Sequence, residues 1–241
     1  MNEDACLVGQ AVAGGSGDKP EPFAIESEPW IVAVSDGIGG HRAGLEASRE
    51  VVEALGRCTR FTPTGVRDVL QRTSRRLCDR GRRDPECAGM GATVAGIACG
   101  AKGLFAFNVG DSRVYKYSRQ RLLQVTRDDS EAEELIRHGL LPRDGSPRPG
   151  YLHALTQAVG GRTESVEIHP HLYPLSVASQ ARFLVCSDGV TDMVPHDALQ
   201  DALEHAADDA AAVQQLFHLA MEAGGGDNIT LAVVGVRKVE S

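Results

Sequence analysis

The chain has 241 residues, of which 42% are hydrophobic and 24% charged, a composition typical of one large or two small globular domains. Its formal net charge of −8 argues against a nucleic-acid partner, and we interpret the basic residues 72–83 as a solvated helix face. No apolar run approaches the ~18 residues of a membrane span. No basic start precedes an apolar segment either, so we expect a cytoplasmic protein without a membrane partner.

The first part of the chain shows one strand and two helices. Residues 13–22 form a Gly/Pro-rich loop, which we expect to connect two short strands as a hairpin. The apolar run 31–35 predicts a buried strand. Apolar residues at every fourth position predict a helix over 43–55, and a second amphipathic helix follows Thr64.

The middle of the chain has the chemistry of antiparallel strands. Short apolar segments separated by Gly, Asp and Ser predict hairpins rather than crossover units. These segments are residues 92–99, 104–109, 113–118 and 121–125. Residues 127–165 are polar and rich in Pro and Gly, with a short helical pattern near 131–138. They predict a flap that leaves the sheet.

The last third of the chain returns to strands. Apolar segments predict strands at residues 166–173, 182–187 and 229–236, and helical patterns lie at 198–206 and 210–221. Strands and helices therefore come in blocks, which predicts an α+β fold over a single domain of residues 1–241. Six cysteines are scattered without a C-x-x-C pair, and we interpret them as reduced, mostly buried thiols.

Aspartate recurs at the ends of predicted strands, beside glycine. The strand ends carry Asp36, Asp111 and Asp188, and Asp227 stands just before the last strand. One such residue is an ordinary turn aspartate. If all four strand ends converge, however, their carboxylates repel one another and their pKa values rise, a cost that a divalent cation relieves. Oxygen ligands select Mg²⁺ or Mn²⁺, and no His or Cys spacing indicates zinc.

Six motifs together resemble the protein phosphatase 2C (PPM) family in its bacterial form. They occur in family order over almost the whole chain: NED (2–4), DGIGGH (36–41), GAT (91–93), VGDSR (109–113), SDGVTD (187–192) and GDN (226–228). The resemblance implies a central β-sandwich of two antiparallel sheets flanked by helices (α-β-β-α), with the flap near the active site. It also implies metal-dependent hydrolysis of phosphoserine and phosphothreonine in proteins by a Mn²⁺- or Mg²⁺-activated bridging water. The substrates would be the products of a Ser/Thr kinase, and we expect a monomer.

The resemblance implies a role for each acidic motif residue. Asp36 would bridge two metal ions, with the Gly37 carbonyl as a further ligand. Asp188 and Asp227 would complete the first metal site, and Glu3 would lie at the second.

Three further carboxylates complete the metal assignment. Asp4 would position the waters of the second metal, and Asp111 and Asp192 match the residues that hold a third, weaker metal. The catalytic assignment pairs Asp36 with His41, which would donate a proton or organise water. The alternative for His41 is a turn histidine with a structural hydrogen bond.

The chain departs from the family pattern where phosphate is bound. Most members carry an arginine that would precede Met1, as would the family's first strand, so we expect weak activity of the chain as given. Arg42 and Arg113 are candidate substitutes, although a surface or structural role is favoured for each. Asp129 and Gln157 stand where histidine and arginine are usual, so substrate preference does not transfer.

Three other readings compete with a protein phosphatase. A pseudophosphatase or regulatory binding module would keep the fold without the reaction, and a related hydrolase would act on small phosphorylated metabolites. A cysteine phosphatase is excluded, because the sequence after Cys186 offers no arginine cradle for phosphate.

Overall fold

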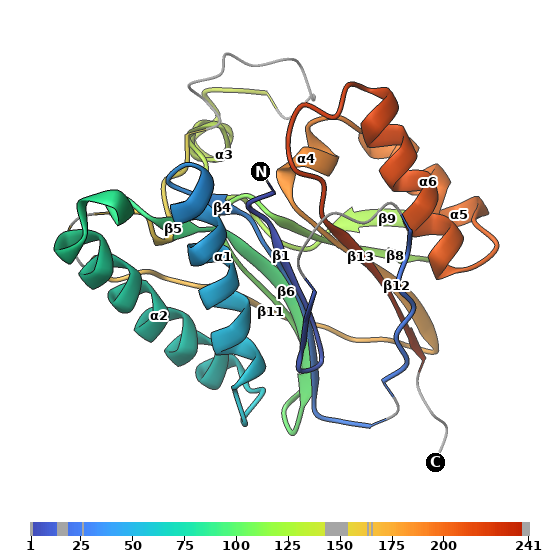
Figure 1. The fold of residues 1–241 in the computed structure, drawn as a ribbon. Helices are drawn as coiled ribbons and strands as arrows, with labels where there is room; N and C mark the ends of the chain where they lie inside the picture. Colours follow the sequence, from blue (N-terminus) through green and yellow to red (C-terminus); the bar gives the residue numbers. More distant parts are fainter. Residues whose placement is uncertain are drawn as a thin grey trace.

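Two antiparallel β-sheets lie face to face, with helices over the outer side of each (Figure 1). This computed structural model describes residues 2–13, 19–25, 27–142, 154–162, 164 and 166–237, with the side chains of Ala13 and His41 left aside. The layers confirm the predicted α+β fold with a β-sandwich at its centre.

The first sheet has six described strands, in the order β11-β7-β6-β3-β1-β2. Their bounds are β1 Ala5–Val8, β2 Ala11–Ala13, β3 Trp30–Ser35, β6 Val94–Gly100, β7 Gly103–Val109 and β11 His171–Pro174. The second sheet has the order β13-β12-β8-β9. Its strands are β8 Arg113–Ser118, β9 Arg121–Gln124, β12 Gln180–Cys186 and β13 Leu231–Arg237. Three two-residue strands pair separately: β4 Gly37–Ile38, β5 Gly91–Ala92 and β10 Val159–Gly160.

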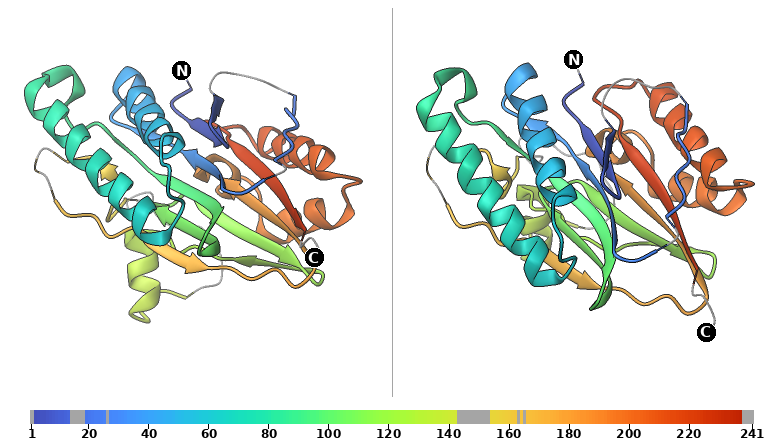
Figure 2. Two further views of the ribbon diagram at one scale, coloured as in Figure 1. Left: turned by 90° about the horizontal axis from the view of Figure 1, so that it is seen from below. Right: turned by 60° about the horizontal axis from the view of Figure 1, so that its bottom comes forward.

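The helices form the two outer layers and the flap. They are α1 His41–Gly56, α2 Pro63–Arg83, α3 Glu131–Arg137, α4 Asp188–Thr191, α5 His196–His205 and α6 Asp209–Glu222, with a 3₁₀ turn at Pro85–Cys87. Figure 2 shows α1 and α2 on one side of the sandwich and α5 and α6 on the other. The Thr62 hydroxyl begins α2 by accepting a hydrogen bond from the Gly65 amide, and Pro63 occupies the first helical turn, where no amide donor is needed.

Three apolar cores separate the four layers. In β3, Ile31 and Ala33 face the core under α1 and α2, whereas Val32 and Val34 face the core between the sheets. This alternation is the two-residue period of a strand that is buried on both faces. A third core, which includes Leu184 of β12, lies beneath α5 and α6. Both sheets are thus covered on both sides, and the site is built from residues just beyond the strand ends.

Several predicted boundaries were wrong. The loop at 13–22 does not join a hairpin, because β2 and β3 both pair with β1; the hairpin is β1–β2, which turns at Gly9 in the left-handed region (φ 63°). The predicted strand 92–99 is interrupted at Thr93. The predicted strand 166–173 begins only at His171, since Pro170 has no amide to donate.

One predicted hairpin is also absent. Strands β7 and β8 belong to different sheets, so the VGDSR segment carries the chain from one sheet to the other. Gly110 allows this departure, because its φ of 95° lies in the region that favours glycine. The VGDSR segment therefore passes the site instead of joining β7 and β8 as a hairpin.

The predicted flap is described for residues 127–142, 154–162 and 164. Ser130 and Leu155 form an isolated antiparallel bridge that joins its two sides. Its helix α3 lies at the same end of the molecule as α4 and the N-terminus (Figure 1). None of the helices in the described ranges is long and apolar enough to cross a membrane.

Candidate functional site

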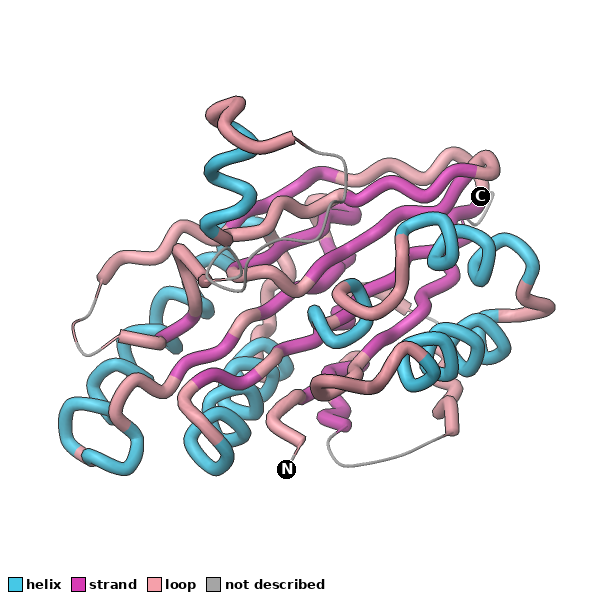
Figure 3. The backbone as a smooth tube through the Cα atoms, turned by 90° about the horizontal axis from the view of Figure 1, so that it is seen from above, coloured by secondary structure: helices cyan, strands magenta, loops and turns pink. Residues whose placement is uncertain are grey.

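The aspartates at the strand ends converge at one end of the sandwich. Asp36 follows β3, Asp111 follows β7, Asp188 begins α4 directly after β12, and Asp227 lies four residues before β13. Figure 3 looks onto this end and shows the short α4 near the middle, between the helices of the two outer layers. The convergence that the motifs predict is therefore present in the fold.

Asp36 is at the centre of this carboxylate cluster. Burial, together with the negative charges of Asp4, Asp188 and Asp227, raises the pKa of the Asp36 carboxyl to about 10. Asp4 is only 2% exposed, and burial raises the pKa of its carboxyl to about 6. A proton therefore binds Asp36 far more readily than it binds an aspartate in water, and a cation has the same electrostatic advantage.

The cluster extends from Asp188 to the motif residues Asp111 and Asp192. Burial raises the pKa of Asp188, with additional contributions from the charges of Asp192 and Asp227. Burial likewise raises the pKa of Asp111 to about 7, and Asp188 contributes to that shift. Asp192 and Asp227 are exposed, so the cluster runs from a buried centre to an open rim.

The donor atoms fit a hard divalent cation. One carboxylate oxygen of Asp4 and one of Asp188 are buried without a hydrogen-bond partner, a state that costs free energy unless a proton or cation occupies it. The donors are oxygens, which Mg²⁺ and Mn²⁺ prefer. In the described residues no group of three or more His, Cys, Asp or Glu is placed so that it could hold a metal ion. Mg²⁺ does not require three protein ligands, because it keeps several waters and binds through one or two carboxylates.

Thr93, in the GAT motif, fixes the backbone around Asp36. The Thr93 amide donates to the Asp36 carbonyl at 2.9 Å, and the Asp36 amide donates to the Thr93 hydroxyl at 3.2 Å. The same hydroxyl lies 2.7 Å from that of Ser112, and the Ser35 hydroxyl donates to the Thr93 carbonyl at 2.6 Å. This buried network links the end of β3 to the starts of β6 and β8. Thr93 therefore supports the backbone position of Asp36.

Thr93→Val is expected to lower the free energy of unfolding by about 1–3 kcal/mol, because the Asp36 amide and the Ser112 hydroxyl lose a buried partner. Thr93→Ser keeps the hydroxyl and is expected to retain more of the stability. Chemical denaturation of both variants without metal measures the difference. Equal stabilities of the two variants would contradict the assigned role of the hydroxyl.

Hydrogen bonds from distant residues hold the N-terminal segment in the site. The Glu3 amide donates to the Asn228 side chain at 2.7 Å, and the Ser48 hydroxyl donates to the Glu3 carbonyl. The Ser187 hydroxyl donates to the Asp4 carboxylate at 2.9 Å. The NED and GDN motifs therefore lie side by side, although they are at opposite ends of the sequence.

Close backbone packing surrounds the same residues. A Cβ added to Gly37 would clash with the Gly44 carbonyl and would lie 2.8 Å from the Glu3 carbonyl. A Cβ added to Gly44 would collide with the Glu3 carboxylate, and one added to Gly189 would collide with the Asn228 carbonyl. Gly37 and Gly44 allow the start of α1 to approach the N-terminal segment, and Gly189 allows α4 to approach the segment around Asn228. Sequence reasoning missed Gly44, because nothing but its tertiary neighbours marks it.

The structure describes the side chains of the two candidate phosphate-binding arginines but not that of the proposed general acid. His41 begins α1, but its side chain lies outside the described residues, so its role stays a prediction. The Arg42 side chain is 84% exposed and pairs with Glu46. Arg113 is held by Asp128 through nitrogen–oxygen distances of 2.6 and 3.0 Å. Both arginines thus have the surface and structural roles that were favoured for them.

Asp129 and Gln157, the two flap residues that depart from the family pattern, contact each other. The Gln157 side-chain amide donates to Asp129 at 2.9 Å, as does the Gly110 amide. His171 Nε2 lies 2.8 Å from the other Asp129 oxygen. Asp129 and Gln157 therefore belong to a hydrogen-bond network that connects the flap to Gly110, in the turn before Asp111. No local pattern marks His171, since it joins through tertiary contact alone.

The described cysteines carry no disulfide, as predicted, and Cys186 has no catalytic character. Its side chain is fully buried, and burial raises the pKa of the thiol to about 12. A thiolate nucleophile at this position is excluded near neutral pH.

The metal-free protein is expected to be more stable at pH 5 than at pH 8. Folded-state pKa values of about 6 for Asp4, 7 for Asp111 and 10 for Asp36 exceed the ordinary value, so in this window the folded state binds more protons than the unfolded state. Stability therefore falls as pH rises. Thermal melting in EDTA across this range measures the trend. A metal-free protein that melts higher at pH 8 would contradict it.

Comparison with known proteins gives a consistent set of relatives. Residues 18–224 match the family described as Protein phosphatase 2C. The chain is 29% identical over 213 residues to the serine/threonine protein phosphatase PstP of Mycobacterium tuberculosis, covering 86% of this chain but 40% of the relative's length. It is 30% identical over 213 residues to the serine/threonine phosphatase stp of Listeria welshimeri, covering 85% of this chain and 83% of the relative.

Solved structures share the fold. The phosphatase MsPP of Mycobacterium smegmatis, in complex with cacodylate, is 26% identical with a TM-score of 0.77, over 97% of this chain and 91% of that one. The catalytic domain of the phosphatase PstP, in complex with two manganese ions, is 26% identical with a TM-score of 0.71, over 96% of both chains.

Proposed function

The chain belongs to the protein phosphatase 2C family, and from that premise we propose that it is a metal-dependent phosphatase of phosphoserine and phosphothreonine in proteins. The observation that carries the proposal is the buried carboxylate cluster around Asp36, whose pKa is raised to about 10. Buried carboxylates at such proximity destabilise a protein unless they bind a cation.

Two Mn²⁺ or Mg²⁺ ions would be held by the motif residues. Asp36 would be shared by both ions, with the Gly37 carbonyl as a further ligand. Asp188 and Asp227 would serve the first ion and Glu3 the second. A neighbouring solved structure with two manganese ions supports this number for the family. When bound, such cations polarise phosphate oxygens and lower the pKa of the attacking water.

The remaining carboxylates would act around these ions. Asp4, with one unpartnered oxygen, would orient water at the second ion. Asp111 and Asp192 would hold a third, weaker ion. Asp111 is half-buried and Asp192 is exposed, which supports weaker binding at this position. The role of the chain is to keep these oxygens fixed before substrate arrives, through Thr93 on Asp36 and Ser187 on Asp4.

The substrates would be phosphorylated proteins, the products of an opposing Ser/Thr kinase, and the chain would act as a monomer. The relatives named as serine/threonine phosphatases support this substrate class. The flap would influence which protein is accepted, because it is tied to the turn before Asp111 through Asp129. His41 would donate a proton or organise water at the start of α1.

Release of phosphate from a phosphothreonine peptide, measured with Mn²⁺ or Mg²⁺, with EDTA and after metal is restored, tests the proposal. We expect turnover that EDTA abolishes and Mn²⁺ restores, together with a rise in melting temperature on Mn²⁺ addition. A rise in melting temperature without turnover would identify the pseudophosphatase alternative. Absence of both effects would overturn the metal site itself.

A further inference from the structure

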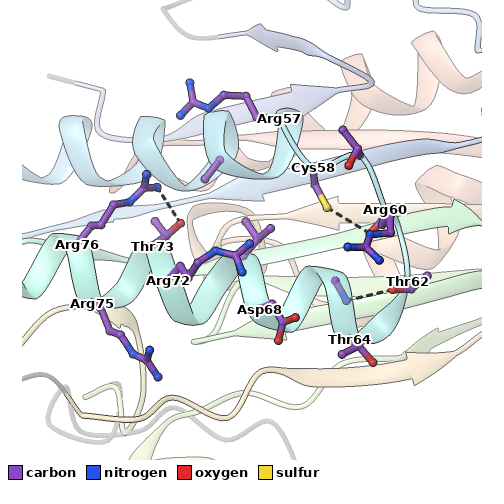
Figure 4. A pocket seen from close by; sticks show the side chains of 14 residues that line it. Arg57, Cys58, Arg60, Thr62, Thr64, Asp68, Arg72, Thr73, Arg75 and Arg76 are labelled. Atoms are coloured by element: carbon purple, nitrogen blue, oxygen red, sulfur yellow. Dashed lines mark hydrogen bonds between the residues drawn. The ribbon is translucent and has the colours of Figure 1, made fainter.

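Five arginines surround a concave region between the end of α1 and the first half of α2 (Figure 4). The region, here called the arginine pocket, has a volume of about 640 Å³. Its arginines are Arg57, Arg60, Arg72, Arg75 and Arg76. Asp68 is the one acidic residue among its described lining residues. Because the chain as a whole carries a formal charge of −8, this concentration of positive charge is a local feature of one surface.

Much of this charge is not neutralised by neighbours. Arg57 and Arg76 form exposed ion pairs with glutamates of α1, at 3.4 and 3.2 Å. Within the described chain, Arg60, Arg72 and Arg75 form no ion pair by the same distance criterion. Figure 4 shows the Arg60 and Arg72 side chains extending toward each other over the start of α2. Within the described residues, neither of these two guanidinium groups is neutralised by an ion pair.

The Arg60 side of the arginine pocket lies at the opposite end of the sheet from the carboxylate cluster. Strand β6 starts next to Thr93, which holds Asp36, and ends at Gly100, whose added Cβ would lie 2.5 Å from the Phe61 carbonyl in the α1–α2 connection. Seven residues of strand span about 20 Å. A group in the pocket is therefore distinct from the phosphate that the metal site would hydrolyse.

The lining chemistry selects a phosphate carried on a protein. Arginine binds phosphate through two parallel hydrogen bonds, and phosphorylated motifs are commonly recognised by arginine clusters. The hydroxyls of Thr59, Thr62 and Thr64 add donors to the rim of the pocket. No aromatic side chain is among the described lining residues, so a nucleotide base would find no stacking surface.

We propose that the arginine pocket binds a phosphorylated segment of a protein substrate, at a phosphorylated side chain other than the one being hydrolysed. The identity of the partner as a substrate rests on the proposed function, whereas the binding of phosphate rests on the arginines alone. An extended peptide covers about 3.3 Å per residue. The two phosphorylated positions would therefore lie at least about six residues apart, and farther when the segment follows the surface.

Binding to the pocket is measured by fluorescence anisotropy of a labelled phosphothreonine peptide in EDTA, which prevents hydrolysis. The double variant Arg60→Glu/Arg72→Glu is expected to raise the Kd by at least about tenfold, because two charge-assisted contacts become repulsive. The matched control is Arg49→Glu/Arg67→Glu, which makes the same charge change at exposed positions on α1 and α2 that do not line the pocket. We expect the control to bind like the unaltered protein.

Three results would overturn the proposal. The first is equal loss of binding in the control, which would indicate attraction by overall charge. The second is equal binding of the unphosphorylated peptide, which would exclude phosphate recognition. The third is displacement of the peptide by inorganic phosphate at a concentration similar to the Kd of the peptide. Free phosphate would then bind as tightly as the peptide, and the protein segment would contribute nothing.

Kinetics separate this proposal from the function itself. With p-nitrophenyl phosphate, which is too small to reach both sites, Arg60→Glu/Arg72→Glu is expected to match the unaltered protein. With a doubly phosphorylated peptide the KM is expected to rise at least about tenfold at constant kcat. An unchanged KM overturns docking in the pocket. If the unaltered protein shows no p-nitrophenyl phosphate turnover but still binds the phosphopeptide more tightly than Arg60→Glu/Arg72→Glu does, the proposed function is rejected. The proposal that the pocket binds phosphate would then still stand.

Discussion

Asp36→Asn is expected to reduce Mn²⁺-dependent phosphate release on the order of a thousandfold while making the metal-free protein more stable. The loss follows because the carboxylate proposed to hold both cations is replaced by an amide, and several kcal/mol of cation stabilisation correspond to about three powers of ten in rate. The gain in stability follows because Asp36 is buried beside Asp4 and Asp188, whose charges oppose its ionisation. The amide has similar size and no charge.

Two measurements check this pair of effects. Phosphate release from a phosphothreonine peptide gives the rate, and chemical denaturation in EDTA at pH 8 gives the free energy of unfolding. Asp201→Asn is the control, since that carboxylate is exposed on α5 and is expected to leave the rate unchanged. An Asp36→Asn protein that is less stable than the unaltered chain in EDTA would show that the carboxylate is structural rather than a cation ligand.

Gly37→Ala is expected to lower turnover by about a hundredfold and stability by about 1–3 kcal/mol. The added methyl group would meet the carbonyls of Gly44 and Glu3, which belong to the backbone and do not rotate away. Relief requires α1 or the N-terminal segment to shift, and both carry or adjoin proposed ligands. Displacement of a reacting group by about 1 Å is sufficient for a loss of this size.

Gly56→Ala is the matched control for Gly37→Ala. Gly56 ends α1, and an added Cβ there would first meet the Leu7 side chain at 3.2 Å. Side chains adjust where carbonyls do not, and alanine favours a helix over glycine by about 1 kcal/mol. We expect normal turnover and a stability change within that range, measured by the same assays. Equal losses in both variants would contradict the clash at Gly37.

The main elements could be predicted because their patterns are local. The apolar residues of α1 recur at helical spacing, and the run that forms β3 ends on Asp36 beside glycine, so both were recognisable in the sequence. The positions of the site carboxylates followed from the same strand ends. Their mutual approach was an inference from several motifs together, and in the fold Asp4 and Asp188 lie near enough to Asp36 for their charges to raise its pKa.

The features that could not be predicted depend on contacts between distant residues. Gly110 turns the chain out of one sheet into the other, which the hairpin-like spacing around it did not reveal. The partners of Asp129 lie 28 and 42 residues away, at Gln157 and His171, so no local pattern announces them. Residues 72–83, which supply three arginines of the pocket, were interpreted as a solvated helix face, because the sequence does not show that the Arg60 side chain extends toward Arg72.

The hydrogen bond between Glu3 and Asn228 joins residues 225 positions apart, and it has a consequence for biosynthesis. Contacts at such separation form late, because a long loop has to close before they are gained. Asp227 and β13 follow all the other elements of the site in chain order. A nascent chain on the ribosome therefore lacks a complete centre until β13 emerges. We therefore expect fragments that end before Asp227 to lack the proposed phosphatase activity.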